Sequence, residues 1–211
     1  MVACASRLLG SNHRRCGPHP AGVGTLPRPI RGATAGALAA RALRLNCLTT
    51  HYADLWDEVW PQSPSPGWSL DDPRLSPWPS LTSKWSRASA LRNAFERRWA
   101  LVEIDALAAL ELGLTVDELC TIYRTQFPVL REYERDTWFD TRGKIAFTAS
   151  KGLVGVGLDR KSFELWQEHL RQDRPPPKDL DTQGLTPPFE IRDREADMAT
   201  AFRFFEERLG R

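Results

Sequence analysis

The sequence has few of the features that mark a membrane-spanning or a secreted protein. No apolar run approaches 18 residues, so we expect no transmembrane helix. Cysteine is sparse, at four in 211 residues, and no apolar segment with a small-residue cleavage site opens the chain. We therefore expect no disulfide framework and no export, and a reducing cytoplasm as the compartment.

The chain is also short of apolar residues and of uninterrupted segments. Hydrophobic residues make up 41%, and sixteen prolines and fourteen glycines break the sequence at many points. This composition favours a loosely built, partly helical domain over a compact enzyme.

Acidic residues are absent from the first 53 positions, which contain seven arginines and so carry +7. Since the whole chain carries +2, the remaining 158 residues carry −5. The bulk of the chain is mildly acidic, so we do not expect a positive electrostatic potential over the whole surface that would attract nucleic acid. Any DNA contact therefore needs a local basic patch.

Residues 1–35 are rich in Arg, Gly and Pro and show no sustained periodicity. We interpret them as a disordered basic leader, translated from sequence upstream of a truncation or frameshift. Two other interpretations stay open, a mitochondrial transit peptide and a basic arm that binds nucleic acid.

Residues 36–60 are predicted to form one helix that Pro61 ends, because apolar side chains recur in steps of three and four. This stripe consists of Leu38, Ala42, Leu45, Thr49, Tyr52, Trp56 and Val59. Residues 61–83 hold six prolines and six serines and are predicted to be a linker or a long surface loop. Within it, Trp68 and Trp78 are expected to pin the loop against the body.

An αα-hairpin is predicted next. Its first helix runs from about Lys84 to Glu111, and Gly113 supplies the left-handed end. Thr115 and Glu118 match a capping box that starts the second helix, which Pro128 ends.

The rest of the region 84–211 is predicted to be mainly helical, with one small β-hairpin. The hairpin is placed near residues 137–148, with a turn from Asp140 to Gly143. A glycine-rich loop follows at 151–161, and shorter helices are expected near 162–172 and 193–209. The expected fold class is thus mainly α, with amphipathic helices, an αα-hairpin, one β-hairpin and proline-rich loops.

Two groups of residues invite a chemical interpretation that their context does not support. The first, Cys4, His13, Cys16 and His19, lacks the paired spacing of a zinc site. The second is Cys120 with a histidine partner at His51 or His169. Because Cys120 lies on an apolar helical stripe, we expect a buried, inert thiol. The sequence thus offers no catalytic, cofactor-binding or metal-binding residue.

Two further motifs concern nucleic acids. Lys144, Lys151 and Lys161 flank the glycine-rich stretch and are candidates for contacts with phosphate groups, although the stretch matches no phosphate-loop pattern. Thr186-Pro-Pro-Phe189 has the outline of an adenine-methyltransferase tetrapeptide. That motif begins with Asn or Asp, which holds the amino group of a flipped base, and Thr186 offers only a hydroxyl.

Four stretches carry a family resemblance, and the second is long and specific. They are ALRLNCLTTHYADLW (42–56), LVEIDALAALELGLTVDELCTIYRTQFPVL (101–130), KGLVGVGLDRK (151–161) and DREADMATAF (193–202). Together they resemble the C-terminal region of actinobacterial adenine-specific DNA methyltransferases of the restriction–modification type, which use S-adenosylmethionine. The chain departs from that family in lacking the cofactor-binding fold and the active-site tetrapeptide, and the segment between Lys161 and Pro187 is shorter.

The resemblance implies a C-terminal region that packs on catalytic and target-recognition parts and helps to hold DNA. No catalytic residue of the family can be assigned here, and S-adenosylmethionine would belong to the parent enzyme. The leading hypothesis is a methyltransferase fragment that is inactive by itself. The alternative is a free-standing adaptor that pairs with a separately encoded catalytic chain. The partners expected are therefore DNA and a catalytic methyltransferase chain, with no membrane.

Overall fold

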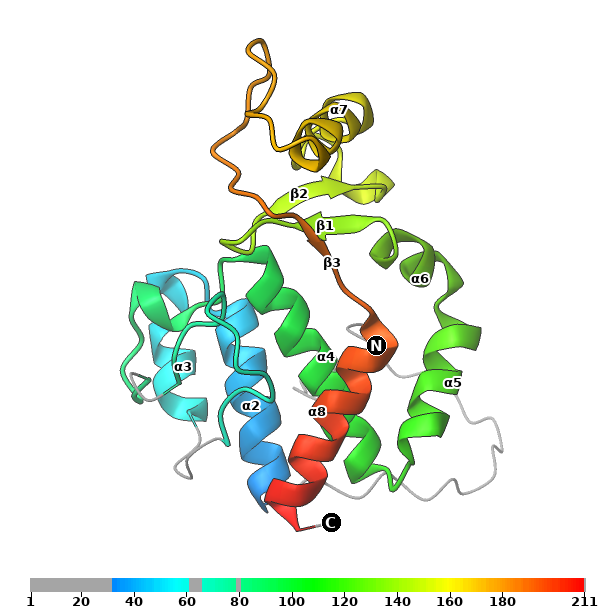
Figure 1. The fold of residues 1–211 in the computed structure, drawn as a ribbon. Helices are drawn as coiled ribbons and strands as arrows, with labels where there is room; N and C mark the ends of the chain where they lie inside the picture. The colour runs from blue at the N-terminus through cyan, green and yellow to red at the C-terminus, as the bar shows by residue number, and fades with distance from the viewer. Residues whose placement is uncertain (1–31, 61–65, 79–80, 211) are drawn as a thin grey trace, which may run out of the picture.

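The computed structural model describes residues 32–60, 66–78 and 81–210, which form a helical body with a small sheet at one end (Figure 1). Within these residues there are seven α-helices and one three-stranded antiparallel sheet, as the predicted mainly α class requires. None of the described helices is both long enough and apolar enough to cross a membrane. The helices are α2 (Gly32–Asn46), α3 (Ala53–Val59), α4 (Ala94–Glu111), α5 (Val116–Gln126), α6 (Pro128–Glu134), α7 (Arg160–Arg171) and α8 (Arg194–Leu209).

The helical body is built around α4, which packs on α2, α5 and α8. The helix predicted near 193–209 is confirmed as α8, and its Met198, Ala201, Phe202 and Phe205 are buried against α4. Asp193 caps α8: its side chain accepts hydrogen bonds from the first free backbone N–H groups of the helix.

The predicted αα-hairpin is α4 followed by α5. Gly113 adopts a left-handed conformation (φ +71°) between them. The capping box is present, since the Thr115 hydroxyl accepts from the Glu118 N–H while the Glu118 carboxylate accepts from the Thr115 N–H. Pro128 ends α5 but also begins α6. A proline is well tolerated in the first turn of a helix, because the backbone N–H that it lacks would have no acceptor within the helix.

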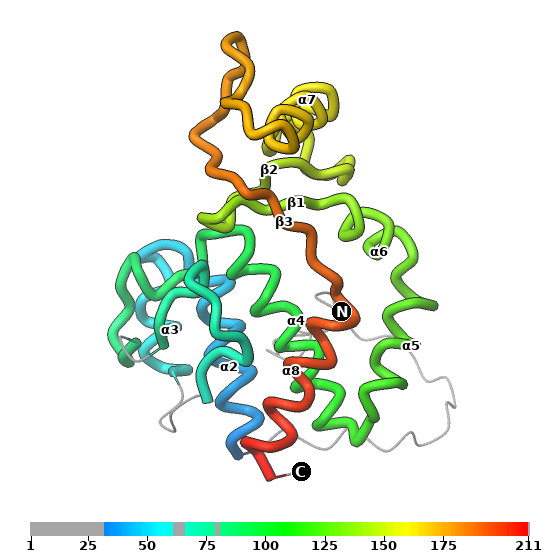
Figure 2. Tube along the Cα trace, in the orientation of Figure 1, coloured from blue at the N-terminus to red at the C-terminus, as the bar shows by residue number. Residues whose placement is uncertain are grey.

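The sheet has the order β2-β1-β3, and the predicted hairpin supplies β1 (Thr137–Phe139) and β2 (Ile145–Thr148). The third strand, β3 (Glu190–Ile191), was not predicted; the chain after α7 loops back to β1 before it enters α8 (Figure 2). One face of the sheet carries α7, with Phe147, Phe163 and Trp166 in a separate small core.

The predicted single helix over residues 36–60 is wrong, because α2 ends at Asn46 and α3 begins at Ala53. The Cys47 carbonyl accepts a hydrogen bond from the Trp85 indole N–H at 2.8 Å, whereas a continuous helix would use that carbonyl internally. The bend lets Leu43 on α2 and Trp56 on α3 bury in one cluster. The leader predicted over residues 1–35 overlaps α2 at residues 32–35, and residues 1–31 lie outside the described part.

The segment 61–83 is not a linker where the structure describes it. Residues 66–78 pack on the helical body, with Leu75 buried beside Phe95 and Trp99. As predicted, Trp68 and Trp78 pin this segment against the body: Trp68 packs on Leu45, and the guanidinium of the buried Arg44 lies 5.1 and 4.7 Å from the Trp68 and Trp78 ring centroids. The helix predicted from Lys84 begins only at Ala94, where the Asn93 side chain provides the cap.

Candidate functional site: an apolar groove beside a paired charge cluster

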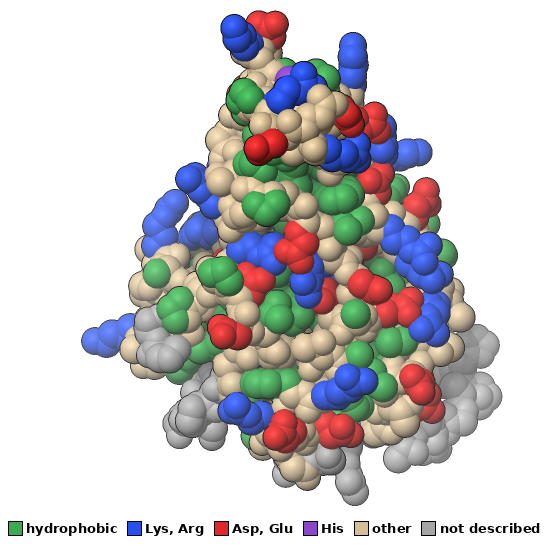
Figure 3. Space-filling model, in the orientation of Figure 1, with side chains coloured by type: hydrophobic (Ala, Val, Ile, Leu, Met, Phe, Trp, Pro, Cys, Tyr) green, Lys and Arg blue, Asp and Glu red, His purple; other side chains and the backbone are tan. Residues whose placement is uncertain are grey.

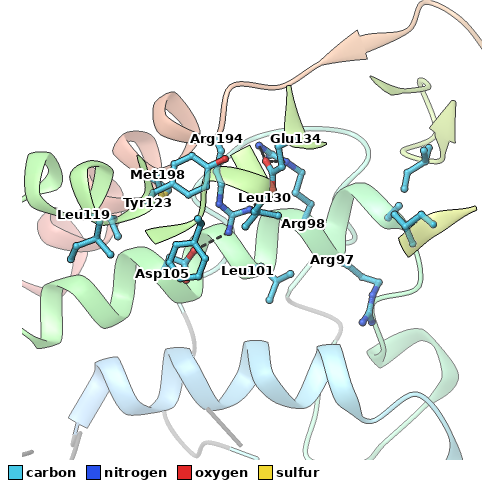
Figure 4. A pocket seen from close by; sticks show the side chains of 15 residues that line it. Arg97, Arg98, Leu101, Asp105, Leu119, Tyr123, Leu130, Glu134, Arg194 and Met198 are labelled. Atoms are coloured by element: carbon cyan, nitrogen blue, oxygen red, sulfur yellow. Dashed lines mark hydrogen bonds and ion pairs between the residues drawn. The ribbon is translucent and has the colours of Figure 1, made fainter. Parts of the chain in front are cut away.

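An open groove of about 430 Å³ lies between α4, α5 and α6 (Figure 4). Leu101 on α4 and Leu119 and Ile122 on α5 form part of its apolar lining. Leu130 on α6 and Leu153, from the loop after β2, complete that lining from two other segments. The groove is thus assembled by helices that α4 holds together.

One wall of the groove is charged, and its charges are paired. Arg98 on α4 bridges Glu134 on α6 (2.8 Å) and Asp197 on α8 (2.6 Å). Arg194 bridges the same Glu134 (2.5 Å) and Asp105 on α4 (2.8 Å), the contact drawn in Figure 4. Bonds shared among α4, α6 and α8 fix the position of α6 and therefore the width of the groove.

Two side chains of this wall, Tyr123 and Arg194, have a raised pKa. Burial raises the pKa of Tyr123 to about 12, so its hydroxyl stays neutral. For Arg194, burial alone would lower the pKa, but Glu134 and Asp105 outweigh it and raise the pKa above its ordinary value. A proton-transfer role at neutral pH is therefore not favoured for either group.

The apolar lining continues onto exposed surface. Val129 and Leu130 on α6 are 57% and 39% exposed, and Leu153 and Val154 in the loop are 42% and 88% exposed. Since Leu130 and Leu153 both line the groove, these side chains extend its apolar surface outward. Contiguous exposed apolar surface of this kind is typical of binding sites for other polypeptides.

A second hollow, of about 480 Å³, lies on the other side of Tyr123 and is mostly charged. There Arg124 and Arg131 both approach Glu195, at 2.5 and 3.6 Å. Exposed pairs of this kind contribute little to stability. We therefore assign the ion pairs of Glu195 only a role in positioning the first turn of α8 against α5 and α6.

The three predicted phosphate-contacting lysines are exposed, and the structure does not bring them together. Lys144 lies at the turn before β2, whereas Lys151 follows the opposite end of that strand. Lys161 is near Lys151, because its neighbour Arg160 pairs with Asp136 at that same end of the sheet (2.6 Å). A single contact surface formed by all three lysines is therefore not what the fold provides.

Thr186 has a structural role. Its N–H donates to the Asp140 carboxylate at 3.1 Å, and its carbonyl accepts from the Thr141 N–H and hydroxyl. Phe189 packs on Phe163 and Trp166. This segment holds the loop after α7 against the β1–β2 turn, and its resemblance to a catalytic tetrapeptide ends at the sequence.

Cys120 is buried on α5, with its sulfur 4.0 Å from the Glu195 carbonyl oxygen. Burial raises the pKa of its thiol, as it does for Cys47. Of the two candidate partners, His51 is exposed, and His169 Nδ1 lies 2.7 Å from the Pro175 carbonyl oxygen. The candidate zinc ligands at positions 4, 13, 16 and 19 lie outside the described residues, and the described ones include no group of three or more possible metal ligands.

We expect both buried thiols to be unreactive in the folded protein. In a Cys4→Ser/Cys16→Ser variant at pH 8, a disulfide reagent such as dithionitrobenzoate should modify Cys47 and Cys120 only at the rate of unfolding, because the thiolate is disfavoured and covered. Adding urea should release both thiols together. Fast modification of one thiol in the native protein would contradict its burial.

The groove itself was missed by the sequence analysis. Ile122, Leu130 and Leu153 come from three segments whose proximity no local pattern reveals. One signal was present: Val129 and Leu130 are apolar and follow Pro128, where the helix on the buried stripe had already ended.

Fold and groove together define a mainly α protein with an open, non-polar binding surface. No protein-family model, curated protein or solved structure matches the chain. The methyltransferase resemblance of the stretch 101–130 therefore stays a prediction from the sequence.

Proposed function

We propose that this chain is a non-catalytic packing region of an adenine-specific DNA methyltransferase, and that its groove receives a helical segment of the catalytic polypeptide. The observation that carries the proposal is the groove between α4, α5 and α6, with its apolar lining and exposed apolar rim. Amphipathic helices bind in grooves of this kind through apolar side chains spaced three and four residues apart.

The sequence resemblance supplies the identity of the partner. The stretch 101–130 that carries the resemblance contributes α4, α5 and the start of α6, which are the walls of the groove. A segment that packs on the body of a larger enzyme would keep these walls apolar. The cofactor and the reacting groups would belong to the catalytic polypeptide, so we expect the isolated chain to transfer no methyl groups to DNA.

Two arrangements of this partnership are possible, and the DNA immediately upstream of the coding sequence distinguishes them. A methyltransferase reading frame interrupted by a frameshift identifies the chain as a fragment. An intact neighbouring methyltransferase gene identifies it as a separate subunit. Upstream DNA that encodes no methyltransferase contradicts the proposal.

The groove predicts the effect of one substitution on binding. Leu130→Glu places a charge on the groove lining, and we expect it to weaken binding to the upstream-encoded catalytic polypeptide at least tenfold, as measured by isothermal titration calorimetry. The matched control is Leu165→Glu on α7, a leucine of similar exposure (46% against 39%) outside the groove. Equal weakening by both variants, or by neither, would reject the groove as the binding site.

A further inference from the structure

We propose that Arg87, Arg92, Arg142 and Lys144 form a surface that binds the phosphate backbone of duplex DNA. All four side chains are exposed, and none makes an ion pair with a described residue. Elsewhere in the body the arginines at the centre of the fold are engaged with carboxylates. The positive charge of these four side chains is therefore not balanced by an ion pair within the described residues.

Backbone contacts bring these residues together from two distant segments. The Asn93 side chain caps α4 and also donates to the Arg142 carbonyl at 2.6 Å. The Phe95 N–H donates to the Gly143 carbonyl at 3.0 Å. In the loop before α4, the Arg92 guanidinium donates to the Arg87 carbonyl at 3.5 Å and to the Leu48 carbonyl. The turn between β1 and β2 and the loop before α4 are thus joined at the start of α4.

The approach of these two segments is close. Gly143 has a positive φ of +79°, and a Cβ on it would lie 2.3 Å from the Asn93 side chain. The turn and the cap consequently hold the backbone that carries Arg142 and Lys144 against the backbone next to Arg92. Cations on a fixed frame contact successive phosphates without losing much conformational freedom on binding.

Neighbouring acids do not neutralise this surface. Asp140 is fully buried, and its carboxylate accepts the N–H groups of Arg142, Lys144 and Thr186. Glu96 is also buried and accepts the Ser76 N–H. The exposed acids Asp179 and Asp181 lie in the loop before Gly184, where a Cβ would be 3.8 Å from Lys144 Nζ, and neither forms an ion pair with the four cations. Figure 3 shows blue side chains beside the β1–β2 turn with no red among them.

The composition of the surface indicates the form of nucleic acid. The side chains proposed to contact DNA end in three guanidinium groups and one ammonium group. A guanidinium group can donate two parallel hydrogen bonds to the oxygens of one phosphate. Contacts of this type position a protein on a duplex without reading its sequence. Single strands are bound instead by aromatic platforms interleaved with cations. Of the three lysines predicted from the sequence, only Lys144 belongs to this surface. Its other members are arginines that no local motif marks.

The inference names a DNA-holding surface for the proposed methyltransferase region, but it does not depend on the groove. Its test uses only the full chain and DNA, so its failure is distinguishable from a failure of the docking proposal.

The test compares two triple variants of equal charge by fluorescence anisotropy on a labelled 24-base-pair duplex. The variant Arg87→Ala/Arg142→Ala/Lys144→Ala removes three proposed phosphate contacts and leaves Arg92, which has a structural bond to Leu48. The slope of log affinity against log salt should then fall by about 2.7, at about 0.9 for each contact. The control Arg174→Ala/Lys178→Ala/Arg203→Ala removes the same charge from exposed sites elsewhere and should keep the wild-type slope.

Every outcome of this comparison bears on the proposal. The arginines in residues 1–31 are present in all variants, so their contribution cancels. Circular dichroism and thermal melting should show that both triple variants fold. Equal losses in the two variants would mean that only net charge acts and would overturn the proposal. Preference for a single strand of the same length, or no binding by the wild type at 50 mM salt, would overturn it too.

Discussion

Replacing Glu103 with alanine is expected to destabilise the fold by about 3–5 kcal/mol, because it leaves a buried arginine without its counter-charge. Glu103 is fully buried on α4, and one of its carboxylate oxygens accepts from Arg41 Nε at 2.6 Å. The other oxygen accepts the Ser69 N–H (2.6 Å), the Ser69 hydroxyl (2.7 Å) and the Trp99 indole N–H (3.2 Å). The substitution therefore leaves several buried donors without an acceptor.

Urea denaturation at neutral pH measures this loss as a lower free energy of unfolding. The matched control is Glu207→Ala, an exposed glutamate on α8 without an ion pair, which should change stability by less than about 0.5 kcal/mol. Adding Arg41→Met to Glu103→Ala should recover part of the loss, because the unpaired buried charge is then removed. A loss below about 1 kcal/mol in the single variant would contradict a structural role for this pair.

This buried pair also shows where reasoning from the sequence reaches its limit. Helices α4, α5 and α8 could be predicted because their apolar periodicity, left-handed glycine and capping residues are all local signals. For residues 66–78 the sequence marked Trp68 and Trp78 as anchors, but it did not reveal what they pack on, because that is a pair of arginines inside the protein. Arg41 and Arg44 on α2 are fully buried beneath Trp78, with ring distances of 4.9 and 4.7 Å. If arginine is assumed to lie on the surface, as it usually does, a proline-rich segment that packs on buried arginines is predicted to be a linker.

The same limit applies to the candidate sites. The burial of Cys120 could be predicted from the apolar stripe on which it lies. Lys144 was noticed only because it is near the glycine-rich stretch in sequence. The cap of α4 joins the β1–β2 turn, which carries Arg142 and Lys144, to the loop that carries Arg87 and Arg92, through a contact between residues 49 apart in the sequence. Local motifs can nominate single residues, whereas a surface requires the tertiary contacts that assemble it.

The second large effect is expected at Gly157, where alanine should lower the free energy of unfolding by about 2–5 kcal/mol. Gly157 has a φ of +71°, which costs any residue with a side chain. A Cβ at this position would also lie 2.6 Å from the Ala146 carbonyl oxygen on β2. That carbonyl accepts the Leu158 N–H at 2.8 Å, so moving it away would disturb the contact that joins the loop to the sheet.

Gly155 provides a matched control within the same loop. Its φ is +83°, but a Cβ there would meet nothing within 4 Å. Gly155→Ala should therefore lose only the conformational part, about 1–2 kcal/mol, while Gly157→Ala loses this part and the cost of the clash. Thermal melting of the two variants side by side isolates the clash as their difference. Equal melting temperatures would mean that the loop moves away from β2 at little cost, and would contradict the clash expected at Gly157.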